Sequence, residues 1–265
     1  VGLGTVTHQN IGYLFPMGPY YWLAQSIGLP DWIAQRLWLG TLIALAGLGL
    51  KSFLKAINWS GAGATVAVFF YGLSPYLTHY FYKHSLILLP YVALGWLLSA
   101  TVHATREGGW RWPARFALIT LAAGGINAPS LFFVLLAPML WIAHMVWIDK
   151  EVPFKATIAP LARIAGLGLI TSVWWIASLL IAGKYGINVV RYTESAEAVA
   201  HGSSAPELFR GLGYWFLYGS DAIGPWFKSS VTYTQNAVAM VLSFAIPIAA
   251  VAAARGHGLR VRREG

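Results

Sequence analysis

The sequence predicts an all-α, polytopic membrane helix bundle with about seven spans, and three observations lead to this fold class. First, 57% of the residues are hydrophobic and only 10% are charged, whereas about a quarter of a soluble domain is charged. The mean hydropathy is +0.60. Second, apolar windows long enough to cross a bilayer recur along the chain. Third, the basic residues fall on alternate connections between these windows.

The spans follow from windows of about 20 apolar residues. The seven windows are 31–55, 60–81, 85–104, 112–127, 129–147, 161–183 and 234–254. The fourth window is short and ends at GGINAP, where Gly124, Gly125 and Pro129 predict a turn at membrane depth. Non-helical backbone at that depth persists only against protein or a water-filled cavity. Residues 124–130 are therefore either a cavity wall or an ordinary tight turn.

The basic residues predict the orientation of the bundle. Twelve of the 18 Lys and Arg residues lie on one set of helix ends and loops: Lys51, Lys55, Arg106, Arg111, Arg115, Lys150, Lys155, Arg163, Arg255, Arg260, Arg262 and Arg263. The other six lie on the opposite set: Arg36, Lys83, Lys184, Arg191, Arg210 and Lys228. The first set is expected to be cytoplasmic because cytoplasmic loops carry the excess of Lys and Arg.

Two segments then lie outside the membrane, residues 1–30 and the loop 184–232, and the whole chain 1–265 is expected to be one transmembrane domain. The run HQNIGYLFPMGPYYW at residues 8–22 has no acid, Lys or Arg and is rich in aromatic residues. Residues 11–29 are long enough for an eighth span, but Pro16, Gly18 and Pro19 would leave backbone groups unpaired in lipid. We expect instead a helix that lies along the outer interface.

The sequence lacks the motifs of several functional classes. The sequence has no Walker lysine, HExxH or GxSxG motif, which argues against an ATP-driven pump, a zincin and an α/β-hydrolase. His79 and His84 are five residues apart and poorly placed to share one helix face, so no metal site is predicted, and no cofactor is expected. The net charge of +9 is assigned to cytoplasmic flanks of spans and not to nucleic acid. The nearly uncharged span centres disfavour an ion-coupled transporter.

A membrane enzyme with its chemistry on the outer face remains, and a substrate carried on a lipid suits an aromatic shelf beside a polar loop. The chain begins at Val1 without a basic leader, and we expect it to be a piece of a longer protein.

Three runs of the sequence resemble one family. HQNIGYLFPMGPYYWLAQSIGLPDWIAQRLWLG resembles the start of the large actinobacterial arabinofuranosyltransferases of the AftD type, and GGINAPS and SSAPELFRGLGYW are similar to later parts. These enzymes belong to the GT-C superfamily of polytopic glycosyltransferases. The resemblance implies a GT-C bundle in the plasma membrane. It also implies transfer of arabinofuranose from decaprenyl-phosphoryl arabinose to arabinan of arabinogalactan or lipoarabinomannan, through an α-(1→3) linkage, at the periplasmic face.

Two alternatives stay open, a GT-C mannosyltransferase and a flippase or exporter of a lipid-linked saccharide. A flippase needs a continuous polar path through its spans, whereas a transferase needs polarity mainly at one face, and the sequence favours the transferase. Enzymes of the superfamily usually place a catalytic aspartate in their first outer loop, and the resemblance puts that region before Val1, so no residue of this chain is assigned to it.

An inverting transferase needs a base, groups that hold the leaving phosphate and a cradle for the sugar. The preferred base or acceptor-positioning acid is Glu194, in the outer loop after Arg191, and Glu197 is the second candidate. Each of these is otherwise a solvated loop acid. For the phosphate the candidates are Arg210, Arg191 and Lys184, because guanidinium and ammonium groups bind phosphate.

The remaining candidates are polar or aromatic residues of the outer segments, placed as substrate-binding groups: His8, Gln9, Asn10, Tyr13, Asn127 and Asp221. Solvation in a loop is the plainer alternative for each. The expected partners are the decaprenyl-phosphoryl arabinose donor, the arabinan acceptor and membrane lipids. A further hypothesis is that the basic cytoplasmic face docks an acidic partner such as an acyl carrier protein.

Overall fold

The fold is seen in a computed structural model that describes residues 13–80, 85–125, 128–186, 205–210, 217 and 219–261. The chain forms two compact units, residues 1–187 and 188–265. The division falls inside the predicted outer loop 184–232, and each unit is described by itself.

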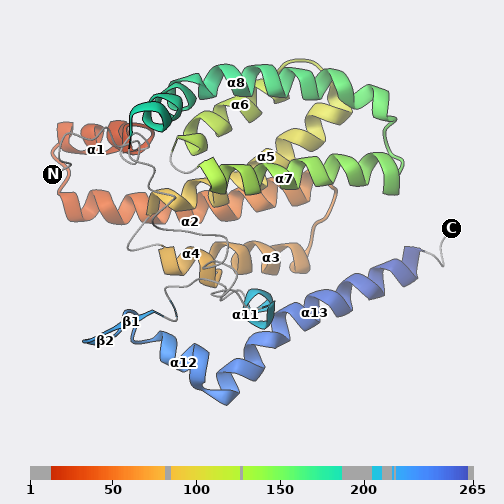
Figure 1. The fold of residues 1–265 in the computed structure, drawn as a ribbon. Helices are drawn as coiled ribbons and strands as arrows, with labels where there is room; N and C mark the ends of the chain where they lie inside the picture. The colour runs from red at the N-terminus through yellow and green to blue at the C-terminus, as the bar shows by residue number, and fades with distance from the viewer. Residues whose placement is uncertain are drawn as a thin grey trace. The chain divides into compact units, whose positions relative to one another are not determined.

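Helices make up the first unit (Figure 1). They are α1 (Met17–Ser26), α2 (Asp31–Ala56), α3 (Ala62–Gly72), α4 (Pro75–Tyr80), the 3-10 turn η2 (Ser85–Ile87), α5 (Leu88–Glu107), α6 (Arg111–Gly124), α7 (Ala128–Ala143), the π turn η3 (His144–Ile148) and α8 (Phe154–Tyr185). The connections α2–α3, α5–α6 and α7–α8 gather at one end of this unit, at the right in Figure 1. These connections therefore share one side, as predicted, and the assignment of that side to the cytoplasm stays a prediction.

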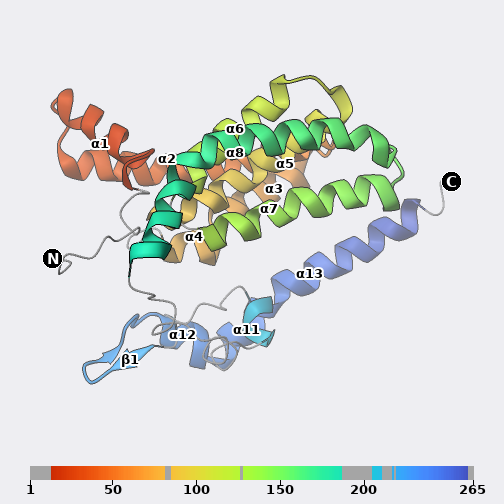
Figure 2. The same cartoon turned by 45° about the horizontal axis from the view of Figure 1, so that its top comes forward.

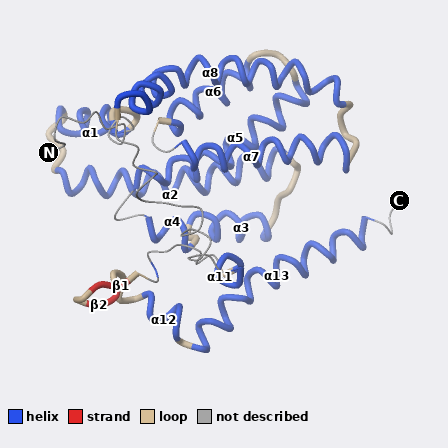
Figure 3. The backbone as a smooth tube through the Cα atoms, viewed as in Figure 1, coloured by secondary structure: helices blue, strands red, loops and turns tan. Residues whose placement is uncertain are grey.

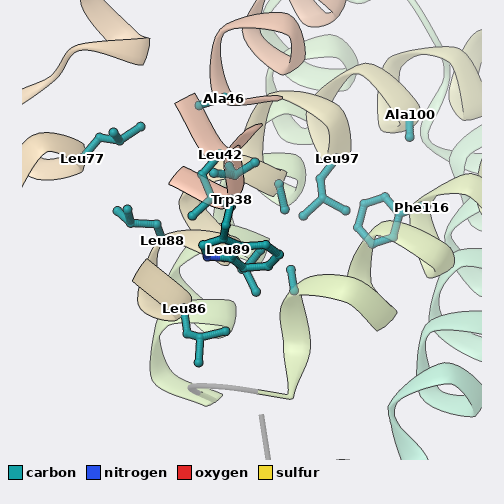
Figure 4. Close-up of a cluster of buried hydrophobic side chains, with 13 residues drawn as sticks. Trp38, Leu42, Ala46, Leu77, Leu86, Leu88, Leu89, Leu97, Ala100 and Phe116 are labelled. Carbon is teal, nitrogen blue, oxygen red and sulfur yellow. The ribbon is translucent and has the colours of Figure 1, made fainter. Parts of the chain in front are cut away.

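The core of the first unit lies around α5, which packs closely against α2, α6 and α7. Figure 4 shows Trp38 and Leu42 of α2 beside Leu89 and Leu97 of α5 in this core. The two helix backbones meet at Gly95, where a Cβ atom would overlap the backbone of Gly49. Small residues of this kind let membrane helices approach closely.

The outer pair of helices is less enclosed. α8 packs mainly on α6 and α7 mainly on α5 (Figures 1 and 2), while α7 and α8 scarcely touch each other. A surface between α7 and α8 is therefore left uncovered by this unit.

Among the described residues, four helical segments are long and apolar enough to cross a membrane: Asp31–Ala56, Ser85–Glu107, Ser130–Ile148 and Phe154–Tyr185. The window predicted at 60–81 is divided into α3 and α4 at Ser74, because Pro75 cannot continue the hydrogen bonding of α3. The window predicted at 112–127 corresponds to α6, which has 14 residues and covers about 21 Å. The last of these four segments is α8. It begins at Phe154, seven residues earlier than predicted, and Pro153 is its N-cap.

The described part of the opening stretch contains α1, which has 10 residues and is too short to cross a bilayer. A short helix in place of an eighth span agrees with the sequence, and its position along the outer interface stays a prediction. Trp22 and Ile27 leave about 70% of their side chains exposed, whereas Tyr20 and Tyr21 turn toward the core.

The second unit contains α11 (Ala205–Phe209), the strands β1 (Ser220–Asp221) and β2 (Gly224–Pro225), α12 (Ser230–Gln235) and α13 (Ala237–Val261). The two strands form an antiparallel hairpin (Figure 3) with Asp221 opposite Gly224. Asn236 separates α12 from α13, and its Oδ1 accepts a hydrogen bond from Ala239 N at 3.0 Å, as an N-cap side chain does. The window predicted at 234–254 lies largely in α13.

Candidate functional site

The structure leaves most of the predicted site residues undescribed. His8, Gln9, Asn10, Asn127, Arg191, Glu194 and Glu197 lie outside the described residues, and their roles stay predictions. Tyr13, Lys184, Arg210 and Asp221 are placed. Tyr13 is about half exposed at the entrance to α1. Lys184 lies in the last turn of α8, with its Nζ 5.3 Å from the ring centre of Tyr185.

Arg210, the first candidate for the phosphate, is buried in the second unit just after α11. Its Nε donates to Ser243 Oγ of α13 at 2.6 Å, and one terminal nitrogen donates to Glu207 Oε1 at 2.6 Å. The other terminal nitrogen donates to the carbonyl of Tyr233 in α12. Each guanidinium nitrogen thus donates to a protein acceptor. Arg210 therefore joins α11, α12 and α13 by hydrogen bonds. Phosphate binding by this residue stays a prediction.

Asp221 lies in the short hairpin of the second unit. The hairpin turns at Ala222 and Ile223, and the Ile223 side chain is 97% exposed. Gly219 precedes β1 and lies against the Trp226 ring, and its carbonyl oxygen accepts a hydrogen bond from Trp226 N at 3.0 Å. The hairpin therefore presents a fixed, partly apolar tip.

Aromatic side chains join α1 to the first turns of α2. The ring centres of Tyr20 and Trp38 are 5.1 Å apart, and those of Tyr21 and Trp38 are 6.4 Å apart. Tyr20 donates its hydroxyl to Ala34 O at 2.7 Å, and Trp38 Nε1 donates to Ser85 Oγ at 3.2 Å. Burial, together with the neighbouring Tyr20 and Asp31, raises the pKa of Tyr21, so its phenol is neutral at physiological pH.

A second group of aromatic residues, here called the tyrosine cluster, consists of Tyr71, Tyr76, Tyr80 and Tyr91. The rings of Tyr71 and Tyr91 are stacked with centres 4.3 Å apart, and each hydroxyl donates to the other residue's carbonyl, at 2.6 and 2.9 Å. Tyr76 lies beside both Tyr80, at 4.9 Å, and Tyr91, at 5.2 Å, and is 37% exposed.

The two aromatic groups border the same hydrophobic core, and α1 and α4, which carry part of each group, lie toward the same end of the first unit (Figure 1). This is the end away from the α5–α6 and α7–α8 connections (Figure 1). The sequence pointed to the aromatic run at 8–22 but not to the tyrosine cluster. The signal that could have found the cluster is the density of Tyr residues around Pro75, in YGLSPYLTHYFY.

A cavity of about 600 Å³ lies between α5, α6, α7 and α8. Phe116, Leu135 and Ile164 are among the side chains that line it. Thr101 and Thr120 also face it, but each donates its hydroxyl to the carbonyl four residues earlier in its own helix, so the lining is almost entirely apolar. Such a space suits a hydrocarbon chain and not a sugar.

The turn between α6 and α7 lies at one end of this cavity. Gly124 contacts the Trp175 indole and Gly125 the Trp174 indole, so the described part of the GGINAPS turn packs against protein. The indole N–H groups of Trp174 and Trp175 are buried and have no acceptor among the described residues. Asn127, predicted to face a cavity here, lies outside them. No group of three His, Asp or Glu side chains in the described part of the chain could hold a metal ion.

The sequence matches one family model, described as "Alpha-(1->3)-arabinofuranosyltransferase, N-terminal GT-C domain", over residues 1–263. It is 26% identical over 261 residues to the alpha-(1->3)-arabinofuranosyltransferase of Mycolicibacterium smegmatis, covering 94% of this chain and 17% of that protein. It is also 26% identical over 218 residues to the Mycobacterium tuberculosis protein of the same name, covering 80% of this chain and 15% of that protein.

A solved structure shares the fold. The cryo-EM structure of the arabinofuranosyltransferase AftD from mycobacteria, mutant R1389S, superposes with a TM-score of 0.62 at 24% identity, over 92% of this chain and 20% of that chain. The chain spans about a sixth of the length of the curated relatives it matches.

Proposed function

This chain belongs to the family of N-terminal GT-C domains of alpha-(1->3)-arabinofuranosyltransferases, and we propose that it forms the membrane domain of an enzyme that transfers arabinofuranose from decaprenyl-phosphoryl arabinose to cell-wall arabinan. The observation that carries the proposal is the family match, which includes 263 of the 265 residues. The transfer takes place at the periplasmic face of the plasma membrane and forms an α-(1→3) linkage.

The reaction requires an acid–base group on that face. The acceptor hydroxyl oxygen forms a bond to the anomeric carbon while the bond from that carbon to the phosphate oxygen breaks. The hydroxyl proton passes to a carboxylate, and decaprenyl phosphate leaves with the bonding electrons. Glu194 is our candidate for that carboxylate and Glu197 the second, because both lie in the predicted outer loop beside Arg191.

The tyrosine cluster supports a sugar-binding role at the same end. Ligand sites are lined mainly by aromatic and apolar side chains with a few polar groups that orient the ligand. Tyr76 is 37% exposed, and its ring lies against those of Tyr80 and Tyr91. We assign this ring to the arabinan acceptor, whose sugar C–H groups would stack on it.

The apolar cavity supports binding of a lipid-linked donor. It borders the bilayer where α7 and α8 leave a gap, and Phe132 and Leu169 at its rim are more than 60% exposed. Its lining side chains on α8 run from Leu161 to Ile176, a length of about 22 Å along the helix. A prenyl chain fits this shape and polarity, and the Trp175 indole at one end offers a hydrogen-bond donor.

The test is transfer of radiolabelled arabinose from decaprenyl-phosphoryl arabinose to an arabinan oligosaccharide, in membranes that contain the protein in its full length. Glu194→Gln and Glu197→Gln are assayed beside it. Asp149→Asn serves as control, because it removes an exposed carboxyl at the opposite end of the first unit. A general base typically contributes 10²–10⁴-fold, so we expect a loss of at least about 100-fold in one Glu variant and full activity in the control.

Three outcomes separate the possibilities. Transfer by the wild type and by both Glu variants keeps the function and rejects these two carboxylates. Transfer only from decaprenyl-phosphoryl mannose makes the protein a mannosyltransferase. No transfer from either donor by folded protein contradicts the proposed function and returns the flippase as the explanation.

The tyrosine ring is tested separately by acceptor kinetics. Tyr76→Ala should raise KM for the arabinan acceptor about ten-fold with kcat nearly unchanged, whereas Tyr76→Phe should keep the wild-type KM because stacking needs the ring and not the hydroxyl. An equal rise in both variants would contradict stacking.

A further inference from the structure

The turn between α5 and α6 carries a group of cationic and aromatic side chains at the predicted cytoplasmic end, away from the tyrosine cluster. We call Trp110, Arg111, Trp112, Arg115 and Arg163 the arginine–tryptophan cluster. The chain passes from α5 to α6 through Gly108 and Gly109, which both have positive φ angles, 68° and 71°. This tight turn places both indoles directly at the start of α6, and Trp110 is 61% exposed.

Two indole rings hold the three guanidinium groups. Arg115 Cζ lies 4.4 Å and Arg111 Cζ 5.5 Å from the ring centre of Trp112. Arg163, from α8, lies 5.1 Å from the ring centre of Trp110 and donates to Gly109 O at 3.0 Å. Cation–π contacts restrict these long side chains and leave N–H groups of each planar fork available.

The nearby acid is already engaged. One Glu107 oxygen lies 2.6 Å from His103 Nδ1 and the other accepts a hydrogen bond from Trp112 Nε1 at 2.6 Å. A second basic residue of this end, Arg106, is paired with both carboxylate oxygens of Glu151, at 2.5 and 3.1 Å.

The arginines of the cluster have no such partner. The ion pairs in the described part of the chain include none of Arg111, Arg115 and Arg163. Glu107 interacts electrostatically with Arg111, so one carboxylate lies beside the three guanidinium groups. Positive charge is still left over on this surface, and Arg111 and Arg115 are exposed.

We propose that the arginine–tryptophan cluster binds the phosphate of an anionic phospholipid headgroup in the cytoplasmic leaflet. Guanidinium groups bind phosphate through paired N–H donors, and the cation–π contacts fix three of them around one turn before the ligand arrives. Tryptophan side chains favour the depth of the headgroups, and the cytoplasmic leaflet carries the anionic lipids. A lipid fits better than an acidic protein because the cluster sits on a short turn at the helix ends. This site does not depend on the transferase reaction.

The experiment uses the full-length protein in detergent with equal amounts of phosphatidylglycerol and phosphatidylcholine, and native mass spectrometry counts the retained lipids. The test variant is Arg111→Gln, Arg115→Gln and Arg163→Gln together. The control is Lys55→Gln, Lys150→Gln and Lys155→Gln, which removes the same charge from exposed residues at the same end. The cluster would hold the phosphate through charge-assisted hydrogen bonds from three guanidinium groups. Retention of phosphatidylglycerol should therefore fall about 100-fold in the test variant, and it should change little in the control, whose lysines belong to no such cluster.

A third variant distinguishes the loss of lipid binding from misfolding. Replacing the same three arginines by lysine keeps the charge and loses the planar fork, and we expect intermediate retention with an unchanged melting temperature. An equal loss in the test and control variants would overturn the proposal, because it would show attraction by net charge alone. Displacement of the lipid by soluble glycerol phosphate at equal concentration would overturn the assignment to the leaflet. Retention of an acidic peptide with no preference between the lipids would overturn it in favour of a protein partner.

Discussion

α5 and α8 are both long and apolar, yet they have opposite surroundings within the first unit. About two-thirds of the membrane window of α5 is buried inside the protein, and for α8 the value is 17%. The difference comes from the neighbours of each helix, because α5 packs against α2, α6 and α7, whereas α8 packs mainly on α6. Gly95 lets α2 approach α5, and Ser99, Thr101 and Thr105 are buried with their hydroxyls hydrogen-bonded. α8 carries small residues too, but a Cβ atom at Gly166 or Gly168 would meet nothing within 4 Å. Hydropathy therefore finds a membrane helix, and a small residue marks a close helix contact only where another helix packs on it.

The largest expected effect comes from replacing a glycine of α5, and the matched change in a glycine of α8 is the comparison. Gly95→Leu should prevent α2 and α5 from packing and cost at least about 3 kcal/mol, because the new side chain meets backbone that cannot move away. Gly166→Leu is the matched change in α8, where a Cβ atom meets nothing within 4 Å, and it should be tolerated. The measurement is the fraction of protein that stays monodisperse in detergent after heating. Equal tolerance at both sites would show that the close approach of α2 and α5 does not stabilise the bundle.

The next effect concerns leucines. Leu97 in α5 is fully buried, and Leu97→Ala should cost about 2–5 kcal/mol by leaving a cavity. Leu180 in α8 is 70% exposed, and Leu180→Ala should stay within about 0.5 kcal/mol. Thermal midpoints of the two variants provide the comparison. A large loss at Leu180 would indicate that further protein covers α8.

A fall in pH should destabilise the C-terminal end of α5 and leave the N-terminal part of α8 unchanged. The Arg106 guanidinium, which is hydrogen-bonded to Glu151, lowers the pKa of that carboxyl below its usual range. The ion pair therefore stabilises the fold fully above the ordinary pKa of about 4.3 and is lost as the pH falls through the lower, folded-state pKa. Glu151→Gln should remove part of the loss of stability between pH 5 and pH 3. Arg163→Gln should leave that pH dependence as it is, because Arg163 donates to the Gly109 carbonyl, which does not titrate.

The smallest effect concerns hydroxyl groups between helices. Ser52 of α2 and Ser99 of α5 share a hydrogen bond of 2.9 Å, and Ser99→Ala should cost about 0.6 kcal/mol. Thr171 of α8 divides its hydroxyl between Ala117 O, at 3.2 Å, and Gly168 O of its own helix, at 3.1 Å. Thr171→Val should cost less, because the contact to α6 is longer and shared. A double-mutant cycle with Ser52→Ala isolates the first value.

The positions of the long helices could be predicted because each holds an uninterrupted apolar window, as at 31–55 and 161–183. The break at Ser74 escaped prediction because Ser74 and Pro75 lie inside a window that is hydrophobic on average, so mean hydropathy stays high through a helix end. The short length of α6 could also be predicted, because Gly124 and Gly125 end its apolar window. The division of the chain near residue 187 depends on packing between distant segments, which hydropathy does not report.

The candidate site could be predicted only by residue type. Acids and arginines of the outer loop were chosen for their chemistry. Arg210 shows how partners decide the role, because Glu207 is three residues away but the other two partners come from helices about 20 to 35 residues away. The tyrosine cluster joins Tyr71 to Tyr91 across 20 residues and a helix break. No local pattern predicts such a pair, since the contact exists only once α3 and α5 are side by side.

The π turn η3 is a place where the fold should tolerate the loss of one residue. Asp149 N bonds to His144 O, five residues earlier and not four, so this turn holds one residue more than an α-helical turn. Deleting one residue between His144 and Ile148 would convert it into an ordinary turn, and the loop before α8 could take up the change. The same deletion in the middle of α5 would rotate every later residue by about 100° and carry its buried face to the outside. Insertions and deletions should therefore be tolerated at the junction of α7 and α8 long before they are tolerated in α5.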